Sequence, residues 1–134
     1  INIKNKKQKK LYLGNLYAKR DWGHAEDYVK AMWLMLQQTK PTDYIIATGN
    51  QYTVKEFINL SAKKLGMKIV WKGSKLKEKA FINNEPIIEI DPRYFRPTEV
   101  DSLKGNSTKA RKELKWKPIH NIKTLIDDMI RNFE

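Results

Sequence analysis

Alternating apolar and polar residues along the chain predict short strands separated by amphipathic helices. Residues 10–14 alternate and stop at a Gly-Asn pair, which is typical of a strand that enters a turn. Residues 25–38 have helical spacing, and their second half is apolar on most sides, which predicts a covered helix. Its expected buried face consists of Ala25, Tyr28, Val29, Met32 and Leu36. Residues 42–48 contain a continuous apolar run of the kind found in interior parallel strands, so these segments suggest the edge of a larger sheet.

The rest of the chain continues this alternation. Thr53 and Glu56 fit a capping box, in which each side chain satisfies a free backbone amide at a helix start. That helix is expected to end at Gly66, because glycine suits a left-handed cap. The other expected elements are a strand at 67–71, a loop at 73–84, a strand at 86–90, a short helix capped by Asn106 or Ser107 and ending at Leu114, and a last helix at 122–133 whose apolar stripe is core. The pattern predicts an α/β fold.

Composition narrows the class of protein. The chain has 134 residues and no cysteine, which excludes disulfides and thiolate metal ligands. His24 and His120 lie far apart in the sequence, so no histidine metal site is expected. No apolar run approaches the roughly 20 residues of a membrane-spanning helix, so we expect no membrane partner. Because neither an initiator methionine nor a secretion signal opens the chain, we expect a piece of a longer, cytoplasmic protein.

The net charge of +12 raises the question of nucleic-acid binding. Arginine supplies only five of the 27 basic residues, and no RNP, zinc-finger or helix-turn-helix pattern accompanies the lysines. Lysine, asparagine and isoleucine also have codons rich in A and T, so genome composition accounts for much of the charge. Nucleic acid is therefore not the expected partner, and a basic nucleic-acid-binding module stays open as an alternative.

The segment from Asp91 to Asp101 carries the clearest candidate chemistry. Arg96 and Glu99 flank Pro97 and Thr98 in a loop that two prolines stiffen. A guanidinium offers a planar pair of donors to phosphate oxygens, whereas a carboxylate accepts hydrogen bonds from sugar hydroxyls. These residues therefore fit a clamp for a diphosphate and its ribose, and we call residues 91–101 the clamp loop. The alternative is a surface turn whose charges are solvated.

A second cation, Arg20, lies between the first expected strand and the first helix, where it can face a ligand across strand ends. The alternative is a surface pair of Arg20 with Asp21, with Trp22 as packing. We interpret His24 as a structural residue at the strand-to-helix transition and Arg93 as a solvated or interface residue. No Ser/His/Asp order, HExxH pair or paired catalytic carboxylates can be placed, so we expect no catalytic residue in this chain.

Seven stretches of the sequence form a recognisable set. They are Leu13-Gly14-Asn15-Leu16, Ala18-Lys19-Arg20-Asp21-Trp22-Gly23-His24-Ala25, Asp27-Tyr28-Val29, Ala31-Met32-Trp33-Leu34-Met35-Leu36-Gln37, Ile46-Ala47-Thr48-Gly49, residues 91–101, and residues 109–114 with Trp116-Lys117-Pro118. Together they resemble the C-terminal part of the GDP-mannose 4,6-dehydratase family, which belongs to the extended short-chain dehydrogenases/reductases. The sequence departs from the family pattern at Tyr17, where Asp is common, and through the lysine-rich segment 73–84. Neither departure touches the clamp residues.

The resemblance implies the C-terminal portion of an extended Rossmann-type fold. Residues 1–50 would be the last strand–helix–strand elements of a Rossmann-type domain whose first part is missing, and residues 51–134 a small α/β substrate-binding domain. The family's enzymes convert GDP-mannose to GDP-4-dehydro-6-deoxy-D-mannose and water with NADP, a step toward GDP-fucose, and a homo-oligomer is expected. Another nucleotide-sugar epimerase or dehydratase of the same superfamily stays open as an alternative.

The resemblance also implies roles for individual residues. Arg20 and Arg96 would grip the diphosphate, Glu99 would accept the ribose hydroxyls, and Pro97 and Thr98 would shape the loop. The family's glycine-rich cofactor turn and catalytic Tyr-x-x-x-Lys belong to its N-terminal domain. Neither occurs here, since the six glycines cannot form G-x-G-x-x-G and no tyrosine precedes a lysine by four positions. We therefore expect NADP to bind the missing domain and this chain alone to be inactive.

Overall fold

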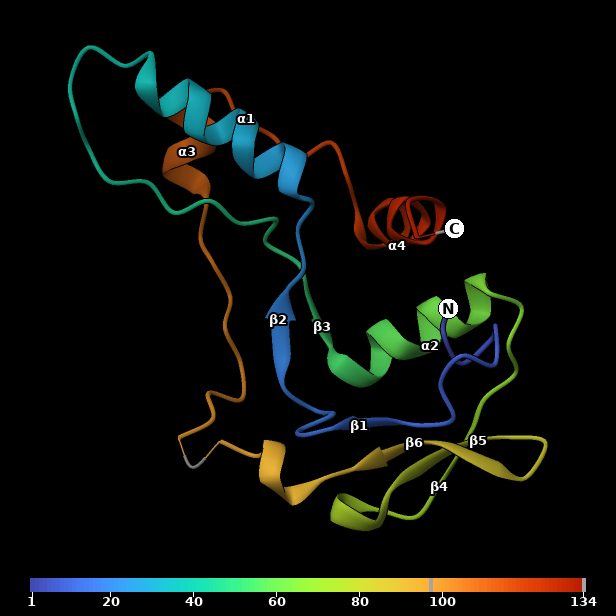
Figure 1. Cartoon of the computed structure of the whole chain (residues 1–134). Coiled ribbons are helices and arrows are strands. Elements are labelled where there is room, and N and C mark those ends of the chain that lie inside the picture. Colours follow the sequence, from blue (N-terminus) through green and yellow to red (C-terminus); the bar gives the residue numbers. More distant parts are fainter. Residues whose placement is uncertain (97, 134) are drawn as a thin grey trace.

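The computed structural model describes residues 1–96 and 98–133. Its elements, shown in Figure 1, are β1 (Leu11–Leu13), β2 (Lys19–Asp21), α1 (Ala25–Leu36), β3 (Gln51–Thr53), α2 (Val54–Lys64), β4 (Val70–Lys72), η1 (Lys75–Lys77), β5 (Lys79–Ile82), β6 (Glu85–Ile90), η2 (Pro92–Tyr94), α3 (Thr108–Glu113) and α4 (Ile122–Arg131). This mixed α/β content agrees with the predicted class. Within the described part of the chain, none of the helices has the length and apolar character needed to cross a membrane.

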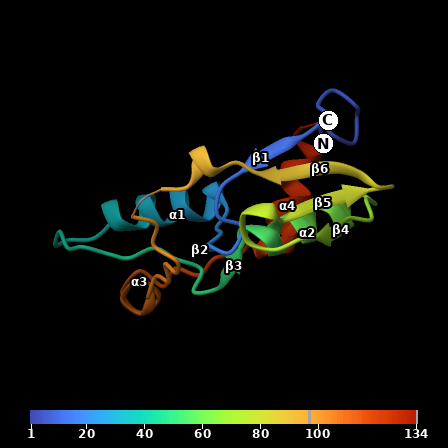
Figure 2. The ribbon, with the colours of Figure 1, turned by 90° about the horizontal axis from the view of Figure 1, so that it is seen from below.

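A four-stranded sheet, α2 and α4 form one end of the molecule. The strand order is β1-β6-β5-β4, with β1 parallel to β6 and the other pairs antiparallel. Seen from below, both helices lie on the same side of the sheet (Figure 2). Ile58 of α2 packs against the buried side chains of Ala80, Ile87 and Ile88, so the core of this end lies between α2 and the sheet.

A second core lies at the other end, between α1 and α3. Ala31 of α1 packs with Ala110 and Leu114 at α3 and with Trp116, which is 2% exposed. The Trp116 indole nitrogen donates to the carbonyl of Asp27 (2.8 Å), so its polar atom is satisfied inside the core.

The antiparallel pair of β2 and β3 connects the two ends of the molecule. On its other side, β2 meets the segment that leaves the clamp loop: the amide of Lys19 donates to the carbonyl of Asp101 (2.8 Å), and Lys19 pairs with Ser102 in a parallel bridge. The strand that carries Arg20 is therefore held on both edges.

The helix ends follow the local sequence signals. Thr53 and Glu56 form the predicted capping box, and Gly66 takes the left-handed conformation (φ 72°) after α2. The short helix α3 receives its predicted cap from Asn106, whose side-chain oxygen accepts from the amide of Thr108 (3.0 Å). Asn121 and Thr124 form a second capping box at α4, which the sequence analysis did not identify.

Two predictions of secondary structure were wrong. Residues 42–48 were predicted as a strand but form none, because a parallel strand needs ladder partners on its edges and the described residues supply none there. Residues 73–84 were predicted as a loop, yet they contain η1 and β5, and β5 lies inside the sheet. Asn83 (φ 48°) and Asn84 (φ 68°) form the tight turn that joins β5 to β6, and asparagine tolerates this left-handed backbone.

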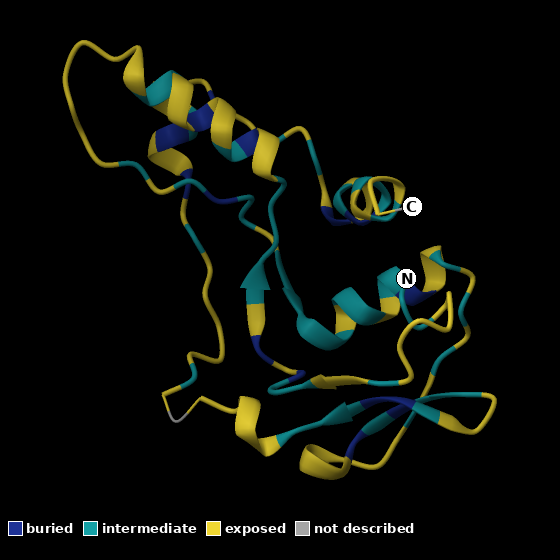
Figure 3. Ribbon diagram, viewed as in Figure 1, coloured by how far each residue is buried: buried dark blue, intermediate teal, exposed yellow. Residues whose placement is uncertain are grey.

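The predicted buried face of α1 is largely exposed, as the yellow segments of Figure 3 show. Val29, Met32 and Leu36 are 62%, 58% and 82% exposed, and Trp33 beside them is 53% exposed. The helix instead turns Ala31 and partly buried Leu34 and Met35 toward the second core. The stripe of α4 is also only partly covered, since Ile122 and Ile126 are buried but Met129 and Phe133 are not.

Candidate functional site

Arg20 and Glu99, two predicted site residues, meet in an ion pair. Nη2 of Arg20 lies 2.6 Å from Oε1 of Glu99, and Nη1 donates to the carbonyls of Val100 (2.7 Å) and Lys19 (2.8 Å). The two side chains are 30% and 18% exposed. The guanidinium therefore ties β2 to the clamp loop at the edge of the protein.

Asp21 is not the partner of Arg20, contrary to the alternative of a surface pair. Its carboxylate accepts from the amides of Thr48 (3.0 Å) and Gly49 (2.8 Å), which fixes the turn before β3. Gly49 has a φ of 85°, a conformation that strains any other residue. Trp22 packs as expected, stacking on Phe57 with ring centres 4.4 Å apart.

The clamp loop begins close to the end of β1. A Cβ atom on Gly14 would lie 2.4 Å from the carbonyl oxygen of Tyr94, so only glycine allows this approach. Asp91 caps η2 and pairs with Arg93 (2.7 Å), whose side chain is 83% exposed. Hydrogen bonds from Arg93 lower the pKa of Asp91. Arg93 therefore has a local surface partner, in line with its predicted solvated role.

The remaining clamp residues lie on the outside of the same loop. Arg96 and Thr98 are exposed, and Pro97 lies outside the described residues. Arg96 makes no hydrogen bond or ion pair with any described residue. The structure thus brings Arg20 and Glu99 together and leaves the Arg96 side chain exposed three residues before Glu99. The clamp roles of all five residues stay predictions.

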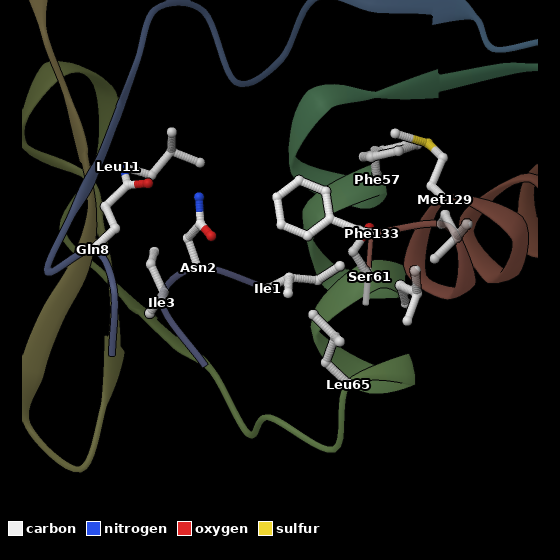
Figure 4. A pocket seen from close by; sticks show the side chains of 12 residues that line it. Ile1, Asn2, Ile3, Gln8, Leu11, Phe57, Ser61, Leu65, Met129 and Phe133 are labelled. Carbon is white, nitrogen blue, oxygen red and sulfur yellow. The ribbon is translucent and has the colours of Figure 1, made fainter. Parts of the chain in front are cut away.

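A hollow of about 580 Å³ borders this loop at the carboxyl ends of β1 and β6. Its lining is mostly apolar and comes from the residues after β1, from the η1 segment, and from the start of the clamp loop, including Leu16, Tyr17, Leu76, Ile90, Pro92 and Phe95. A groove of about 300 Å³ between the N-terminal segment, α2 and α4 is also apolar, as Figure 4 shows. Its described lining holds no charged side chain, so it does not suit a diphosphate.

The two histidines stack, although their separation in sequence suggested no contact. The ring centres of His24 and His120 lie 3.9 Å apart, and their planes differ by 18°. His24 is the structural residue that the sequence predicted: its Nδ1 accepts from the amide of Glu26 at the start of α1. Its Nε2 lies 3.1 Å from Asp128 and lowers the pKa of that carboxyl by hydrogen bonding.

This histidine pair is a poor metal site, although His24, Glu26 and His120 bring ligand atoms within 4.8 Å of one another. A neutral His24 ring whose Nδ1 accepts a hydrogen bond carries its proton on Nε2, so neither nitrogen has a free lone pair. Nearly parallel rings also aim their lone pairs side by side rather than at one ion. The cluster connects the start of α1 to α4, and the spacing of the two histidines in the sequence did not predict this contact.

Solved structures of nucleotide-sugar enzymes share this fold. RMD from Pseudomonas aeruginosa complexed with NADPH matches 99% of this chain with a TM-score of 0.76 and 19% identity, over 39% of that chain. dTDP-glucose 4,6-dehydratase from Bacillus anthracis in complex with NAD matches 95% with a TM-score of 0.70 and 20% identity, over 35% of that chain. The chain therefore has the fold of the C-terminal part of an extended short-chain dehydrogenase/reductase.

Within that class, the family described as GDP-mannose 4,6 dehydratase matches residues 1–129. The GDP-mannose 4,6 dehydratase of Drosophila melanogaster is 47% identical over 96% of this chain, and that of Dictyostelium discoideum is 49% identical over 90%. The chain belongs to the GDP-mannose 4,6-dehydratase family. It spans about a third of the length of these relatives, whose C-terminal part it matches.

Among the described residues, no glycine turn suits the pyrophosphate of a nicotinamide cofactor. A dinucleotide site needs a glycine turn that lets the backbone approach the pyrophosphate. Here the glycines with positive φ, Gly49, Gly66 and Gly73, are isolated from one another, and Gly66 serves as the cap of α2. We therefore assign no residue of this chain to cofactor binding.

Proposed function

We propose that this chain is the nucleotide-sugar-binding part of a GDP-mannose 4,6-dehydratase, an NADP-dependent lyase that converts GDP-D-mannose to GDP-4-dehydro-6-deoxy-D-mannose and water. The observation that carries the proposal is the pairing of Arg20 with Glu99 across 79 residues of sequence, beside an exposed Arg96. Family membership supports the substrate, and the fold supports the position of the site.

Arg20 has donors left for a phosphate. A guanidinium has five N–H donors. Three of those on Arg20 bind Lys19, Val100 and Glu99, which leaves the Nε–H and one Nη2–H without a partner among the described residues. Arg20 can therefore hold the loop and bind a diphosphate oxygen at the same time, and Arg96 would add a second cation from the loop.

Glu99 has a matching capacity for the ribose. Its Oε1 accepts from Arg20, while Oε2 has no partner among the described residues. Such a free carboxylate oxygen can accept hydrogen bonds from the ribose hydroxyls. The neighbouring hollow offers apolar surface to the base.

The contribution to catalysis would be positional. Binding energy from the GDP end of the substrate, far from the reacting carbons, fixes the hexose relative to groups outside this chain, and such remote binding appears as rate. NADP, which supplies the hydride chemistry, and the acid and base groups would belong to the part of the enzyme that this chain lacks.

The decisive test compares two arginines of the same loop in the full-length protein. Arg96→Ala should weaken GDP-mannose binding by roughly ten- to a hundredfold, because a charge-assisted bond to phosphate is worth about 1.5–3 kcal/mol. Arg93→Ala is the matched control, since that side chain is exposed and paired with Asp91, and should change binding less than about twofold. Isothermal titration calorimetry with GDP-mannose, and separately with NADP, measures both. Equal effects of the two substitutions would refute the clamp.

Glu99→Gln tests the ribose contact. The amide keeps one acceptor oxygen but loses the charge, so the loss of affinity should be smaller than for Arg96→Ala. A substrate analogue without the ribose hydroxyls should show little further loss on this substitution, because both changes remove the same contact. Tighter binding of a uridine or thymidine diphosphate sugar than of GDP-mannose would favour another nucleotide-sugar enzyme of the same superfamily.

A further inference from the structure

Tyr17, Lys55 and Glu78 meet in a hydrogen-bonded cluster next to the proposed site. The Tyr17 hydroxyl donates to Oε2 of Glu78 (2.7 Å), and Nζ of Lys55 donates to Oε1 (2.5 Å). The ammonium of Lys55 also lies 4.9 Å from the ring centre of Trp71. Each oxygen of the carboxylate therefore has a donor, and the donors come from two separate segments of the chain.

The carboxylate of Glu78 is buried. Its side chain is 4% exposed, and that of Lys55 is 24% exposed. Burial alone would raise the pKa of Glu78, but the hydrogen bonds from Lys55 and Tyr17 outweigh burial and leave the pKa below its ordinary value. A buried ion of this kind persists only when its partners stay in place, because removing one leaves an uncompensated charge.

Both donors belong to segments that place the strand of Arg20. The amide of Lys55 donates to the carbonyl of Leu16 (2.9 Å), and the preceding amide donates to Ala18 (3.3 Å). Leu16 and Ala18 are buried, and Arg20 follows two residues later. The Tyr17 ring, between them, lines the hollow beside the clamp loop.

We propose that Glu78 is a positioning residue of the nucleotide-sugar site, which acts by holding Tyr17 and Lys55. Through these two residues, Glu78 fixes the position of residues 16–18. Those residues in turn set where Arg20 meets the diphosphate and where the Tyr17 ring borders the hollow. Glu78 itself is too buried to touch the substrate. The inference rests on the proposed function, because it assigns Glu78 a role at that same site.

The cluster also connects the lysine-rich segment 73–84, which contains Glu78, to the residues that precede β2. The tyrosine side chain carries its hydroxyl to the carboxylate of Glu78 (2.7 Å). This contact ties the segment 73–84 to the residues that lead into the strand of Arg20.

Glu89 provides a matched control for Glu78. Its carboxylate is also paired with lysines, Lys10 at 2.6 Å and Lys79 at 3.4 Å, and it lies in β6, next to the strand β5 that follows Glu78. Its partners are in the N-terminal segment and in β5, so neither of them contacts residues 16–18 through a hydrogen bond that the described residues show. Loss of Glu89 should therefore cost stability without changing the site.

The test uses the full-length protein with Glu78→Gln, the milder Tyr17→Phe, and the control Glu89→Gln. Affinity for GDP is measured by calorimetry, and hydrogen exchange is followed at the amides of Lys19 and Lys55, which bind Asp101 and Leu16. We expect about a five- to twentyfold loss of GDP affinity for Glu78→Gln, a smaller loss for Tyr17→Phe, and less than twofold for Glu89→Gln. Exchange at the two amides should accelerate only in the first two variants.

A double variant shows whether Glu78 acts through Arg20. Once Arg20→Ala is present, Glu78→Gln should add little further loss of GDP affinity, because both changes disable the same contact. Fully additive losses, or unchanged affinity in Glu78→Gln, would overturn the proposal. If the unsubstituted protein bound no GDP, the proposed function would fail instead, and unchanged exchange at Lys19 and Lys55 in Glu78→Gln would then separately overturn the positioning role.

Discussion

Arg20 and Glu99 lie 2.6 Å apart, and this ion pair connects a strand near the start of the chain to a loop 79 residues later. Both side chains are partly buried, and Arg20 also binds the carbonyl of Val100. The loop is therefore held in place before any ligand binds. Such preorganisation lowers the entropy that binding would otherwise lose.

Arg20→Lys should disable the site although it conserves the charge. An ammonium is a single donor atom and cannot bind Glu99, the Val100 carbonyl and a phosphate from separate nitrogens, as a guanidinium does. We expect about a tenfold weaker affinity for GDP and faster hydrogen exchange in residues 98–101. Arg93→Lys, in the same loop, should change neither quantity. Full affinity in Arg20→Lys would show that a point charge suffices here.

Asp27 anchors the segment that follows Trp116. Its buried carboxylate accepts from the amides of Ile119 (2.9 Å) and His120 (3.0 Å). Asp27→Asn keeps one acceptor but turns an amide group toward one of these donors, which should cost about 1–3 kcal/mol of unfolding free energy. Urea unfolding of the full-length protein measures this loss. Glu26→Gln, at an exposed neighbour, should stay within about 0.5 kcal/mol; an equal loss there would contradict the assignment.

Acid should destabilise the protein through the same carboxylates. Burial would raise the pKa of Asp27, but hydrogen bonds from Ile119 and His120 lower it below 3.8, and the pKa of Glu78 also lies below its ordinary 4.5. A group whose pKa is depressed by folding stabilises the folded state above its unfolded pKa, and that contribution is lost as the pH falls through the folded pKa.

The contribution of these two carboxylates to the unfolding free energy should therefore be complete above about pH 5 and fall as the pH drops below their ordinary pKa values. The fall should be smaller in Asp27→Asn and in Glu78→Gln, since each removes one of the titrating groups. Urea unfolding at a series of pH values gives the profile. A profile in either variant as steep as that of the unsubstituted protein would show that the carboxylate does not contribute.

The parts of the fold that the sequence predicted correctly are governed by neighbouring residues. The capping box of Thr53 and Glu56 and the glycine cap after α2 depend on contacts within a few residues, so their patterns are visible in the sequence. The strand β5 was missed because the lysines of segment 73–84 suggested a loop, whereas burial of Ala80 and the Asn83-Asn84 turn decide its structure. Long-range packing therefore overrode local composition.

The candidate site shows the same contrast between what the local sequence predicts and what long-range contacts decide. Residue types and the family resemblance pointed to Arg20, Arg96 and Glu99, but only the fold shows that Arg20 binds Glu99 and that Arg96 does not. The stacked histidines and the cluster at Glu78 join residues that lie far apart in sequence. The spacing of residues within one sequence cannot predict such long-range contacts.

The isolated chain should have no dehydratase activity. Its sequence contains neither a G-x-G-x-x-G turn nor a Tyr-x-x-x-Lys pair, and the family resemblance implies that both belong to an N-terminal domain. Incubation with GDP-mannose and NADP should yield no 4-keto sugar above a protein-free blank. Joining the chain to its N-terminal part should restore turnover. Robust turnover by the 134 residues alone would place catalytic groups in this chain and contradict the assignment.

The exposed apolar face of α1 should make the isolated chain prone to self-association. Val29, Met32, Trp33 and Leu36 form a contiguous apolar patch at helical spacing, and such patches bind hydrophobic dyes and promote association. Leu36→Glu should reduce dye fluorescence and self-association of the isolated chain with little change in its unfolding free energy, because Leu36 is 82% exposed.

In the full-length protein the same substitution should instead lower the unfolding free energy by about 1–3 kcal/mol, since the patch would be covered there. Thr39→Glu, which adds the same charge at an exposed position just after the same helix, is the matched control and should show neither effect. Equal stability of Leu36→Glu and the unsubstituted full-length protein would mean that the patch stays exposed in the intact enzyme.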